Sequence, residues 1–217
     1  MKATVECIPC YLKQAISAMR VAGISDSRQQ TLLKALFPVI STLESSKTPA
    51  ENSSLVLFEL YRLLGMEDPF KEAKAYTNRL AKTFIPALEK VIAISDDPLL
   101  TALKASVAGN VIDMGIMPGF NIEASIQEEL SRDFERSDYQ FFRELLREGK
   151  PLVVIGDNSG EIFFDLLLLE QLRNFTDDVT YVVKGGPILN DATLEDAKAA
   201  GIDLIAKVVT TGNNYLG

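Results

Sequence analysis

The stretch Val153-Val-Ile-Gly-Asp-Asn-Ser-Gly-Glu-Ile-Phe-Phe-Asp165 places an acid, an amide and two glycines directly after a short apolar run. That run is rich in β-branched residues and is bounded by glycine, which is typical of a buried strand. The apolar residues after Glu161 continue long enough to form a helix buried against a sheet. The stretch therefore predicts a strand, a turn with polar side chains, and a helix.

The same alternation of strand and helix continues along the rest of the sequence. The predicted strands are 152–155, 179–183 and 204–209, and the predicted helices between them are 161–173 and 192–200. Because crossovers between parallel strands are right-handed, such a series forms a parallel sheet with helices packed on it. We therefore expect a Rossmann-like αβα domain with a mostly parallel sheet.

The residues before 150 show a helical period of about 3.6 instead. The predicted helices are 5–22, 28–45, 52–64, 70–93, 97–109, 121–133 and 136–148. The change of pattern falls at Gly149-Lys-Pro151, which is too short to be a flexible tether. The predicted fold is α/β, with a helical domain at residues 1–149 and a Rossmann-like domain at residues 150–217.

The composition excludes several classes of protein. The chain has 217 residues, of which 47% are hydrophobic, so it can bury a sizeable core. A net charge of −8 with scattered basic residues opposes binding to nucleic acid or to an anionic membrane. No apolar run approaches the ~18 residues of a membrane helix, and the first residues lack the order of a signal peptide. We expect a soluble cytoplasmic protein, whose oligomeric state the sequence does not reveal.

The two cysteines, Cys7 and Cys10, are too few for a disulfide scaffold and fit a reducing compartment. A zinc site needs about four ligands, and two thiols without histidine supply only half of them. We expect both thiols to be reduced, with one of them packed inside. The chain has no histidine, which removes the usual general base and the commonest metal ligand. Any chemistry must use carboxylates, amides, lysine, hydroxyls, the thiols, or a metal held by oxygen.

Three polar loops follow the predicted strands, at 156–160, 184–191 and 210–214. Ligands of an open parallel sheet bind beyond the carboxyl ends of its strands, so these loops are the candidate site. The first loop matches neither a phosphate-binding P-loop nor a dinucleotide fingerprint. It does contain Asp157 and Asn158, and Asp191 follows the second strand.

Two carboxylates and an amide, completed by water, are hard oxygen ligands suited to Mg²⁺ or Mn²⁺. A structural role is the alternative for the same residues. Asn158 and Glu161 have the spacing of a capping box, and Asp191 could cap the helix that follows it. The local pattern leaves both interpretations open.

Three motifs in order carry a resemblance that covers essentially the whole chain. They are Val154-Ile-Gly-Asp-Asn-Ser-Gly-Glu161 with Asp165, Val183-Lys-Gly-Gly-Pro-Ile-Leu-Asn-Asp-Ala-Thr193, and Ala108-Gly-Asn-Val-Ile-Asp-Met-Gly115. The chain resembles the metal-dependent damage-control phosphatases, the domain-of-unknown-function family eighty-nine. The Cys7-Ile-Pro-Cys10 segment is similar to the compact prokaryotic branch of that family.

The resemblance implies a helical domain on a Rossmann-like domain, and hydrolysis of phosphate monoesters of small metabolites such as sugar phosphates. It implies that Asp157, Asn158 and Asp191 are the metal ligands and catalytic residues, with Mn²⁺, Mg²⁺, Co²⁺ or Ni²⁺ accepted. It also places five residues on the substrate side, namely Asn110, Asp113, Glu161, Lys184 and Asn190. Taken alone, Asn110 could be a helix C-cap and Lys184 a solvated strand end.

The sequence departs from the family pattern at one point. Members normally continue to a further strand and a Lys-Gly-Gln-Gly-Asn loop that helps to bind phosphate, and this loop has no match among the 217 residues. We therefore expect the Rossmann-like domain to be truncated at its C-terminus. Two other functions stay open: a nucleotide- or methyl-donor-binding Rossmann-like enzyme, and a metal-binding module without catalysis.

Overall fold

The computed structural model describes residues 1–114 and 121–216, with the backbone alone at residues 113 and 114. The fold divides into two units. The N-terminal unit comprises Met1–Ala73, Gly186–Asn190 and Asn213–Gly217, and the sheet unit comprises Lys74–Gly185 and Asp191–Gly212. Each unit has its own hydrophobic core. This division differs from the expected boundary after residue 149.

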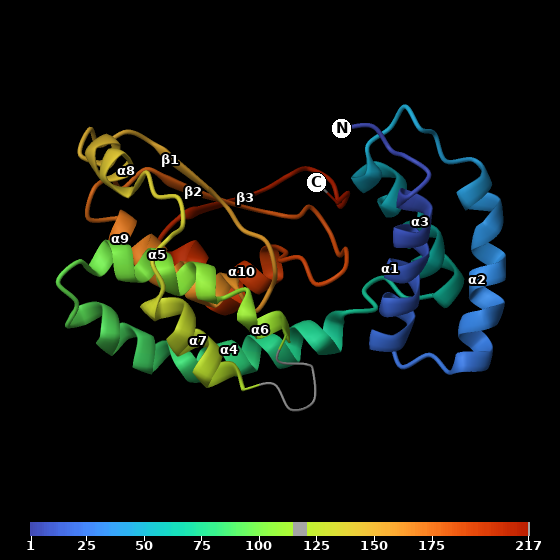
Figure 1. Ribbon diagram of the computed structural model, residues 1–217, viewed down its shortest axis with the longest axis horizontal. Coiled ribbons are helices and arrows are strands. Elements are labelled where there is room, and N and C mark those ends of the chain that lie inside the picture. Colours follow the sequence, from blue (N-terminus) through green and yellow to red (C-terminus); the bar gives the residue numbers. More distant parts are fainter. Residues whose placement is uncertain (115–120, 217) are drawn as a thin grey trace. The chain divides into compact units, whose positions relative to one another are not determined.

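The described sheet contains three parallel strands in the order β1-β2-β3 (Figure 1). They are β1 (Leu152–Ile155), β2 (Val179–Val183) and β3 (Lys207–Thr210), with Ile155 opposite Val182 and Val183 opposite Thr210. The first two strands have the bounds predicted from the sequence. The third begins later than expected, because Ile202–Leu204 forms a 3₁₀ turn, η1, before it. The α/β class and the parallel sheet are confirmed.

Both crossover helices of the sheet, α9 (Ile162–Leu172) and α10 (Leu194–Ala200), pack against each other. They lie on the same side of the strands (Figure 1). The cause is the strand order, since right-handed crossovers that advance in one direction place their helices on one face. On the opposite face of β1, Val153 and Ile155 are 67% and 77% exposed. Within the described residues, the sheet therefore has one helical layer against it where αβα was expected.

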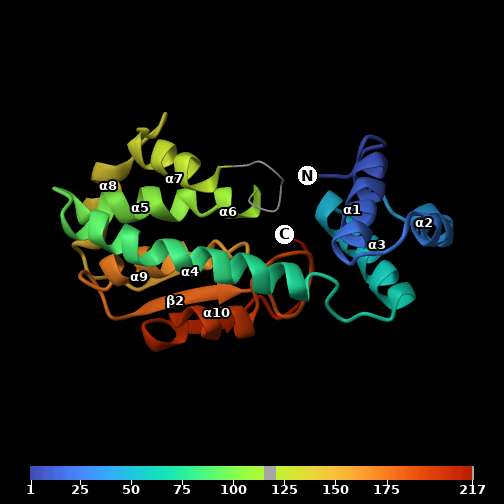
Figure 2. The same cartoon turned by 90° about the horizontal axis from the view of Figure 1, so that it is seen from below.

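The other helices of the sheet unit precede β1 in the sequence. They are α4 (Lys71–Ala93), α5 (Pro98–Ala108), α6 (Val111–Met114), α7 (Ile122–Ser131) and α8 (Tyr139–Leu146). Helix α5 packs on α9, and α7 lies alongside α5 (Figure 2). A single core joins α5, α9 and β2, and includes Ala105, Phe164 and Tyr181. These helices are part of the sheet unit. Among them, α5 covers the apolar surface of α9.

The N-terminal unit is built on α1 (Cys7–Val21), α2 (Asp26–Ser41) and α3 (Pro49–Leu64). Its core includes Met19, Leu36 and Leu57, all fully buried. Helix α3 begins with a capping box between Thr48 and Glu51, a few residues before the sequence-predicted start at 52. Two distant segments join this unit. The Leu189 N–H donates to the Tyr61 hydroxyl at 3.0 Å, and the Leu216 N–H donates to Ser54 Oγ at 2.8 Å. In the described ranges, no helix has the length and apolar character needed to cross a membrane.

Candidate functional site

Main-chain hydrogen bonds bring together the loops that follow β1 and β2. The Ala192 N–H donates to the carbonyl of Asp157 at 2.7 Å, and the Lys184 N–H donates to the carbonyl of Ala192 at 2.9 Å. Asn158 and Asp191 form an isolated antiparallel bridge. The backbone therefore places Asp157, Asn158 and Asp191 at the carboxyl edge of the sheet, with Lys184 beside them.

Neither Asn158 nor Asp191 caps a helix. Helix α9 begins after Glu161, and no described side chain caps it. Helix α10 begins after Thr193, whose capping box is made with Asp196. The cap of α10 is therefore Thr193 and not Asp191, and Asn158 contacts α9 through its main-chain carbonyl, which accepts the Ile162 N–H at 3.2 Å, and not through a side-chain cap. The bridge between Asn158 and Asp191 connects the two loops.

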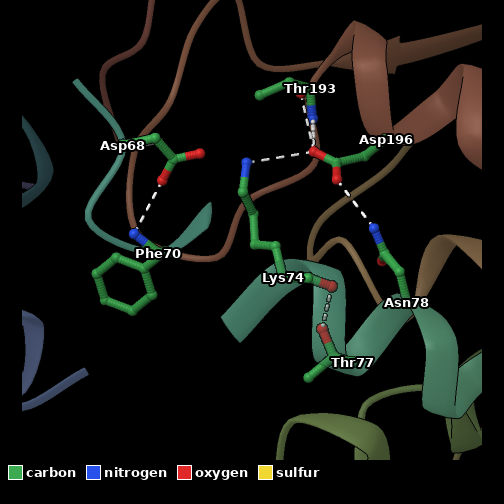
Figure 3. Close-up of polar contacts among 7 residues, drawn as sticks. All are labelled: Asp68, Phe70, Lys74, Thr77, Asn78, Thr193 and Asp196. Atoms are coloured by element: carbon green, nitrogen blue, oxygen red, sulfur yellow. Dashed lines mark hydrogen bonds and ion pairs between the residues drawn. The ribbon is translucent and has the colours of Figure 1, made fainter. Parts of the chain in front are cut away.

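The start of α10 is held by a buried carboxylate that sequence reasoning missed (Figure 3). Asp196 Oδ2 accepts hydrogen bonds from the N–H and Oγ1 of Thr193 at 3.0 and 2.8 Å. From α4, Lys74 Nζ lies 3.3 Å from Asp196 Oδ2, and Asn78 Nδ2 donates to Oδ1 at 3.0 Å. Lys74 and Asp196 are 5% and 8% exposed. Four donors therefore fix the turn that follows Asp191.

Lys184 contributes the positive charge nearest to Asp191 among the contacts described. Its Nζ lies 3.6 Å from Asp191 Oδ2, and the two side chains are 15% and 9% exposed. Lys184 is therefore not a solvated strand end. Burial strengthens the attraction between such charges because less water screens them. The sheet edge therefore combines the shielded carboxylate of Asp191 with the Lys184 ammonium group, which can also bind an anionic ligand.

The donor atoms at this edge fit a hard divalent cation. Asp157 is exposed at the turn, and Asn158 Nδ2 lies 3.5 Å from Asp157 Oδ2. The Ser159 hydroxyl is fully buried and has no hydrogen-bond partner among the described residues. In the same described ranges, no three Asp, Glu or Cys side chains are grouped to hold an ion. A metal here would be held by two carboxylates, one amide oxygen and water, which suits Mg²⁺ or Mn²⁺.

The segment after α5 reaches the start of α9. Asn110 Nδ2 donates to Glu161 Oε1 at 3.1 Å, and a Cβ at Gly109 would lie 3.0 Å from Glu161 Cγ. Asn110 and Glu161 are therefore brought together at the sheet edge. Asp113 lies in α6, but its side chain is outside the described part of the structure. Asn190 is the last residue of a segment that belongs to the N-terminal unit.

The third predicted loop divides between the two units. The Thr211 N–H donates to the Val183 carbonyl at 2.9 Å, so this residue continues the pairing of β3 with β2. Asn213 and Asn214 belong to the N-terminal unit, where Asn214 Nδ2 lies 3.5 Å from the Pro187 carbonyl. Within the sheet unit, the candidate site is therefore formed by the first two loops.

A buried acid supports the turn after β1 from below. Asp165 accepts hydrogen bonds from Ser106 Oγ and from the Tyr181 hydroxyl, each at 2.5 Å. Burial raises the pKa of Asp165 although both hydrogen bonds act in the opposite direction. Burial and the neighbouring Asp165 charge raise the pKa of Tyr181. A Cβ at Gly156 would lie 2.6 Å from Tyr181 Cζ, so only glycine allows the ring to reach the acid.

The fold and this edge define a class of protein: an α/β protein of Rossmann-like type whose polar residues gather at the carboxyl ends of parallel strands. The chain matches the model of the damage-control phosphatase ARMT1-like domain over residues 3–217. It belongs to that family, as the resemblance in its motifs predicted.

Three relatives match the whole chain. An uncharacterized protein of Methanocaldococcus jannaschii is 35% identical, and the match covers 73% of its length. A damage-control phosphatase of Archaeoglobus fulgidus is 33% identical with 77% covered, and one of Pyrococcus horikoshii is 30% identical with 76% covered. A crystal structure of a DUF89 family protein from Pyrococcus horikoshii superposes on the whole chain, with a TM-score of 0.86 and 29% identity over 76% of that protein.

Proposed function

We propose that this chain is a divalent-metal-dependent phosphatase that hydrolyses phosphate monoesters of small metabolites. Asp157, Asn158 and Asp191 hold the metal in this proposal. One observation carries it, namely the main-chain bridge that sets Asn158 opposite Asp191 at the carboxyl edge of the sheet. Membership of the damage-control phosphatase family supports the reaction class.

A bound divalent ion neutralises phosphoryl oxygens and lowers the pKa of water, which supplies a nucleophile without histidine. The chain itself provides positioning and charge. The Lys184 ammonium, 3.6 Å from Asp191 Oδ2, can contact a phosphoryl oxygen held beside that carboxylate. Phosphoryl transfer depends mostly on positioning and on stabilising charge, so this arrangement suits the reaction.

The start of α9 contributes a second attraction for phosphate. This helix has 11 residues, and none of the described side chains caps its N-terminus. The N–H groups of Ile162 and Phe164 already donate to the main-chain carbonyls of Asn158 and Glu161, so the attraction comes from the helix dipole, whose positive end favours anions. Glu161, held by Asn110, borders this position and limits how an anion can approach.

The expected metals are Mn²⁺, Mg²⁺, Co²⁺ and Ni²⁺, because all of them accept oxygen ligands. The expected substrates are sugar phosphates and damaged phosphometabolites. Affinities for divalent ions increase along the first transition series as far as copper, so purified protein can carry a metal other than the physiological one. Metal content should therefore be measured after removal of bound ions and reloading with a single metal.

Asp157→Ala tests the proposal directly. We expect loss of Mn²⁺ binding by calorimetry and loss of phosphate release on a panel of sugar phosphates. Asp177→Ala is the matched control, because the Asp177 side chain is 90% exposed and lies before β2, away from its carboxyl end. Equal Mn²⁺ affinity in Asp157→Ala and the parent would contradict the metal assignment. Metal binding without turnover would indicate a non-catalytic module, and metal-independent adenosyl-cofactor binding would indicate the other Rossmann-like alternative.

A further inference from the structure

The proposed phosphatase site leaves the two cysteines without a role. Cys7 is the first residue of α1, and Cys10 follows it by three positions. Both are unbridged, Cys7 being half-buried and Cys10 exposed. They belong to the N-terminal unit, whereas Asp157, Asn158 and Asp191 belong to the sheet unit. Packing accounts for Cys7, which touches the core of its unit, but does not account for an exposed Cys10.

The sulfur of Cys7 accepts hydrogen bonds from the residue that precedes the helix. The Thr4 N–H donates to Cys7 Sγ at 3.4 Å, and Thr4 Oγ1 lies 3.8 Å from the same sulfur. The Ala3 N–H donates to the Lys47 carbonyl at 3.0 Å and anchors this segment. Hydrogen bonds from Thr4 lower the pKa of the Cys7 thiol, while burial and the nearby Glu6 oppose them. A thiolate is thereby favoured at the start of a helix, where the dipole also stabilises negative charge.

The spacing of the two thiols allows a bond between them. Residues three apart in a helix have Cα atoms about 5 Å apart, within the range of about 4.4–6.8 Å found in disulfides. Their Cβ atoms are about 5–6 Å apart, so the first turn must tighten by ~1 Å. The backbone entering α1 already winds tightly, because Cys7 N–H bonds to the Thr4 carbonyl and Ile8 N–H to that of Val5, at 3.1 and 3.2 Å.

We propose that Cys7 and Cys10 form a redox-active dithiol, which exchanges with small organic disulfides such as oxidised glutathione. The proposal goes beyond the phosphatase function and uses none of its residues. Cys10 is exposed and Cys7 half-buried, so a small disulfide fits better than a folded protein partner. The first turn contains Pro9, whose missing N–H costs little at this position in a helix.

The exchange proceeds in two displacement steps. The Cys7 thiolate attacks one sulfur of the small disulfide, whose S–S bond breaks and releases one thiolate. Cys10 then loses its proton to water and attacks Cys7 Sγ, so that the Cys7–Cys10 bond forms and the second small thiolate leaves. Counted from the dithiol, the protein loses two electrons and two protons, one when Cys7 ionises and one from Cys10; the small disulfide accepts both electrons, and its two released thiolates take up two protons from water to become thiols.

The equilibrium test uses the whole chain in a series of glutathione buffers from fully reduced to fully oxidised. Alkylation after acid quenching, followed by mass spectrometry, counts the thiols that remain. We expect conversion from two thiols to one internal disulfide, with the dependence on [GSH]²/[GSSG] of a two-electron couple. Only glutathione adducts, or two thiols in every buffer, would overturn the proposal.

The kinetic test compares Cys10→Ser with Cys7→Ser. Cys10→Ser should accumulate a stable glutathione adduct on Cys7, and at pH 7 it should react with oxidised glutathione at least about tenfold faster than Cys7→Ser. Its alkylation midpoint should lie below the ordinary thiol value of about 8.5. Thr4→Pro removes the N–H donor and should raise that midpoint, whereas Thr4→Val keeps the N–H and should raise it less. Equal reactivity of the two single cysteines would contradict the assigned roles.

Discussion

Helices α9 and α10 begin at the same edge of the sheet, but their N-termini are stabilised differently. The start of α10 is saturated, since Asp196 accepts hydrogen bonds from Thr193, Asn78 and the buried Lys74. The start of α9 has Glu161 at its N-cap position and, within the described chain, no capping side chain. A helix start that is satisfied by its own side chains has a structural role. The start of α9 is held by its main chain instead, since the N–H groups of Ile162 and Phe164 donate to the carbonyls of Asn158 and Glu161, and it does not use the acidic and amide side chains beside it as caps.

The start of α9 is rigid although no described side chain caps it. A Cβ at Gly160 would lie 2.8 Å from Ile112 Cγ2 and 3.0 Å from Thr77 Cβ. This glycine is therefore required by close packing against α4 and α6. The turn that carries Asp157 is held between these contacts and the Tyr181 ring under Gly156. An ion bound at this turn would meet a preformed backbone.

The largest expected effect comes from breaking the saturated start. Asp196→Ala removes the carboxylate that lies 3.3 Å from the buried Lys74 and also removes the capping box of Thr193. Loss of one partner from a buried ion pair costs about 3–5 kcal/mol. Urea unfolding, monitored by circular dichroism, should show a decrease of this size in the free energy of unfolding.

Glu161→Ala is the control at the start of α9. Its side chain gives α9 no cap, and its contacts include the hydrogen bond from Asn110, so we expect a smaller decrease, of about 1 kcal/mol. Similar losses in Asp196→Ala and Glu161→Ala would remove the distinction between the two helix starts.

The second largest expected effect is a loss of metal affinity in Asp191→Asn. Because Thr193 is the N-cap of α10, this change leaves the cap intact and removes one full negative charge from the proposed ligand set. We expect calorimetry to show at least about a tenfold loss of Mn²⁺ affinity, which is ~1.4 kcal/mol. Asn158→Asp, which adds a charge, should change the preference among metals.

Lys184→Met tests whether an effect of Asp191→Asn comes from the lost metal ligand or from the lost ion pair with Lys184. It removes the ammonium 3.6 Å from Asp191 Oδ2 and keeps both carboxylates, so Mn²⁺ should still bind while phosphate release declines. If Asp191→Asn binds Mn²⁺ as tightly as the parent, Asp191 is not a ligand, and the edge of the sheet has only a structural function.

The smallest effect is a pH dependence beneath the first turn of α9. Burial raises the pKa of Asp165 above its unfolded value of about 3.9, so the folded state binds this proton more tightly. The stability from this difference is complete below about pH 3.9 and is lost as the pH rises through the folded-state pKa. Asp165→Asn has no such proton. In metal-free urea unfolding, the parent should therefore lose stability relative to this variant as the pH rises above about 4. A difference in stability between parent and variant that does not change with pH would contradict the raised pKa of Asp165.

Local pattern was sufficient to predict most of the elements. Leu152–Ile155 and Val179–Val183 are short β-branched runs between turn residues, and both are strands with the expected bounds. The strand expected at 204–209 begins later in the structure, at Lys207. Gly201 adopts a left-handed conformation at the end of α10, and the next residues form a 3₁₀ turn before β3 begins. An apolar run alone does not distinguish such a turn from the first residues of a strand.

The candidate site was predictable only in part. Asp157 and Asp191 could be placed at one edge because parallel strands end on the same side of a sheet. Lys74 and Tyr181 could not be recognised, since each acts through a partner that is distant in the sequence or on another element. Thr193 and Asp196 had the spacing of a capping box, which the sequence interpretation attributed to other residues. Sequence patterns identify residues that can donate hydrogen bonds, but tertiary packing determines which acceptor each donor reaches.

The fit of the Tyr181 ring beneath Gly156 has an evolutionary consequence. A side chain at position 156 would collide with the phenol unless position 181 became smaller at the same time. A smaller residue at 181 would in turn withdraw the hydroxyl that donates to Asp165. No single substitution therefore leads smoothly from this arrangement to another one. Among descendants of such a sequence, positions 156, 165 and 181 are expected to be inherited together or replaced together.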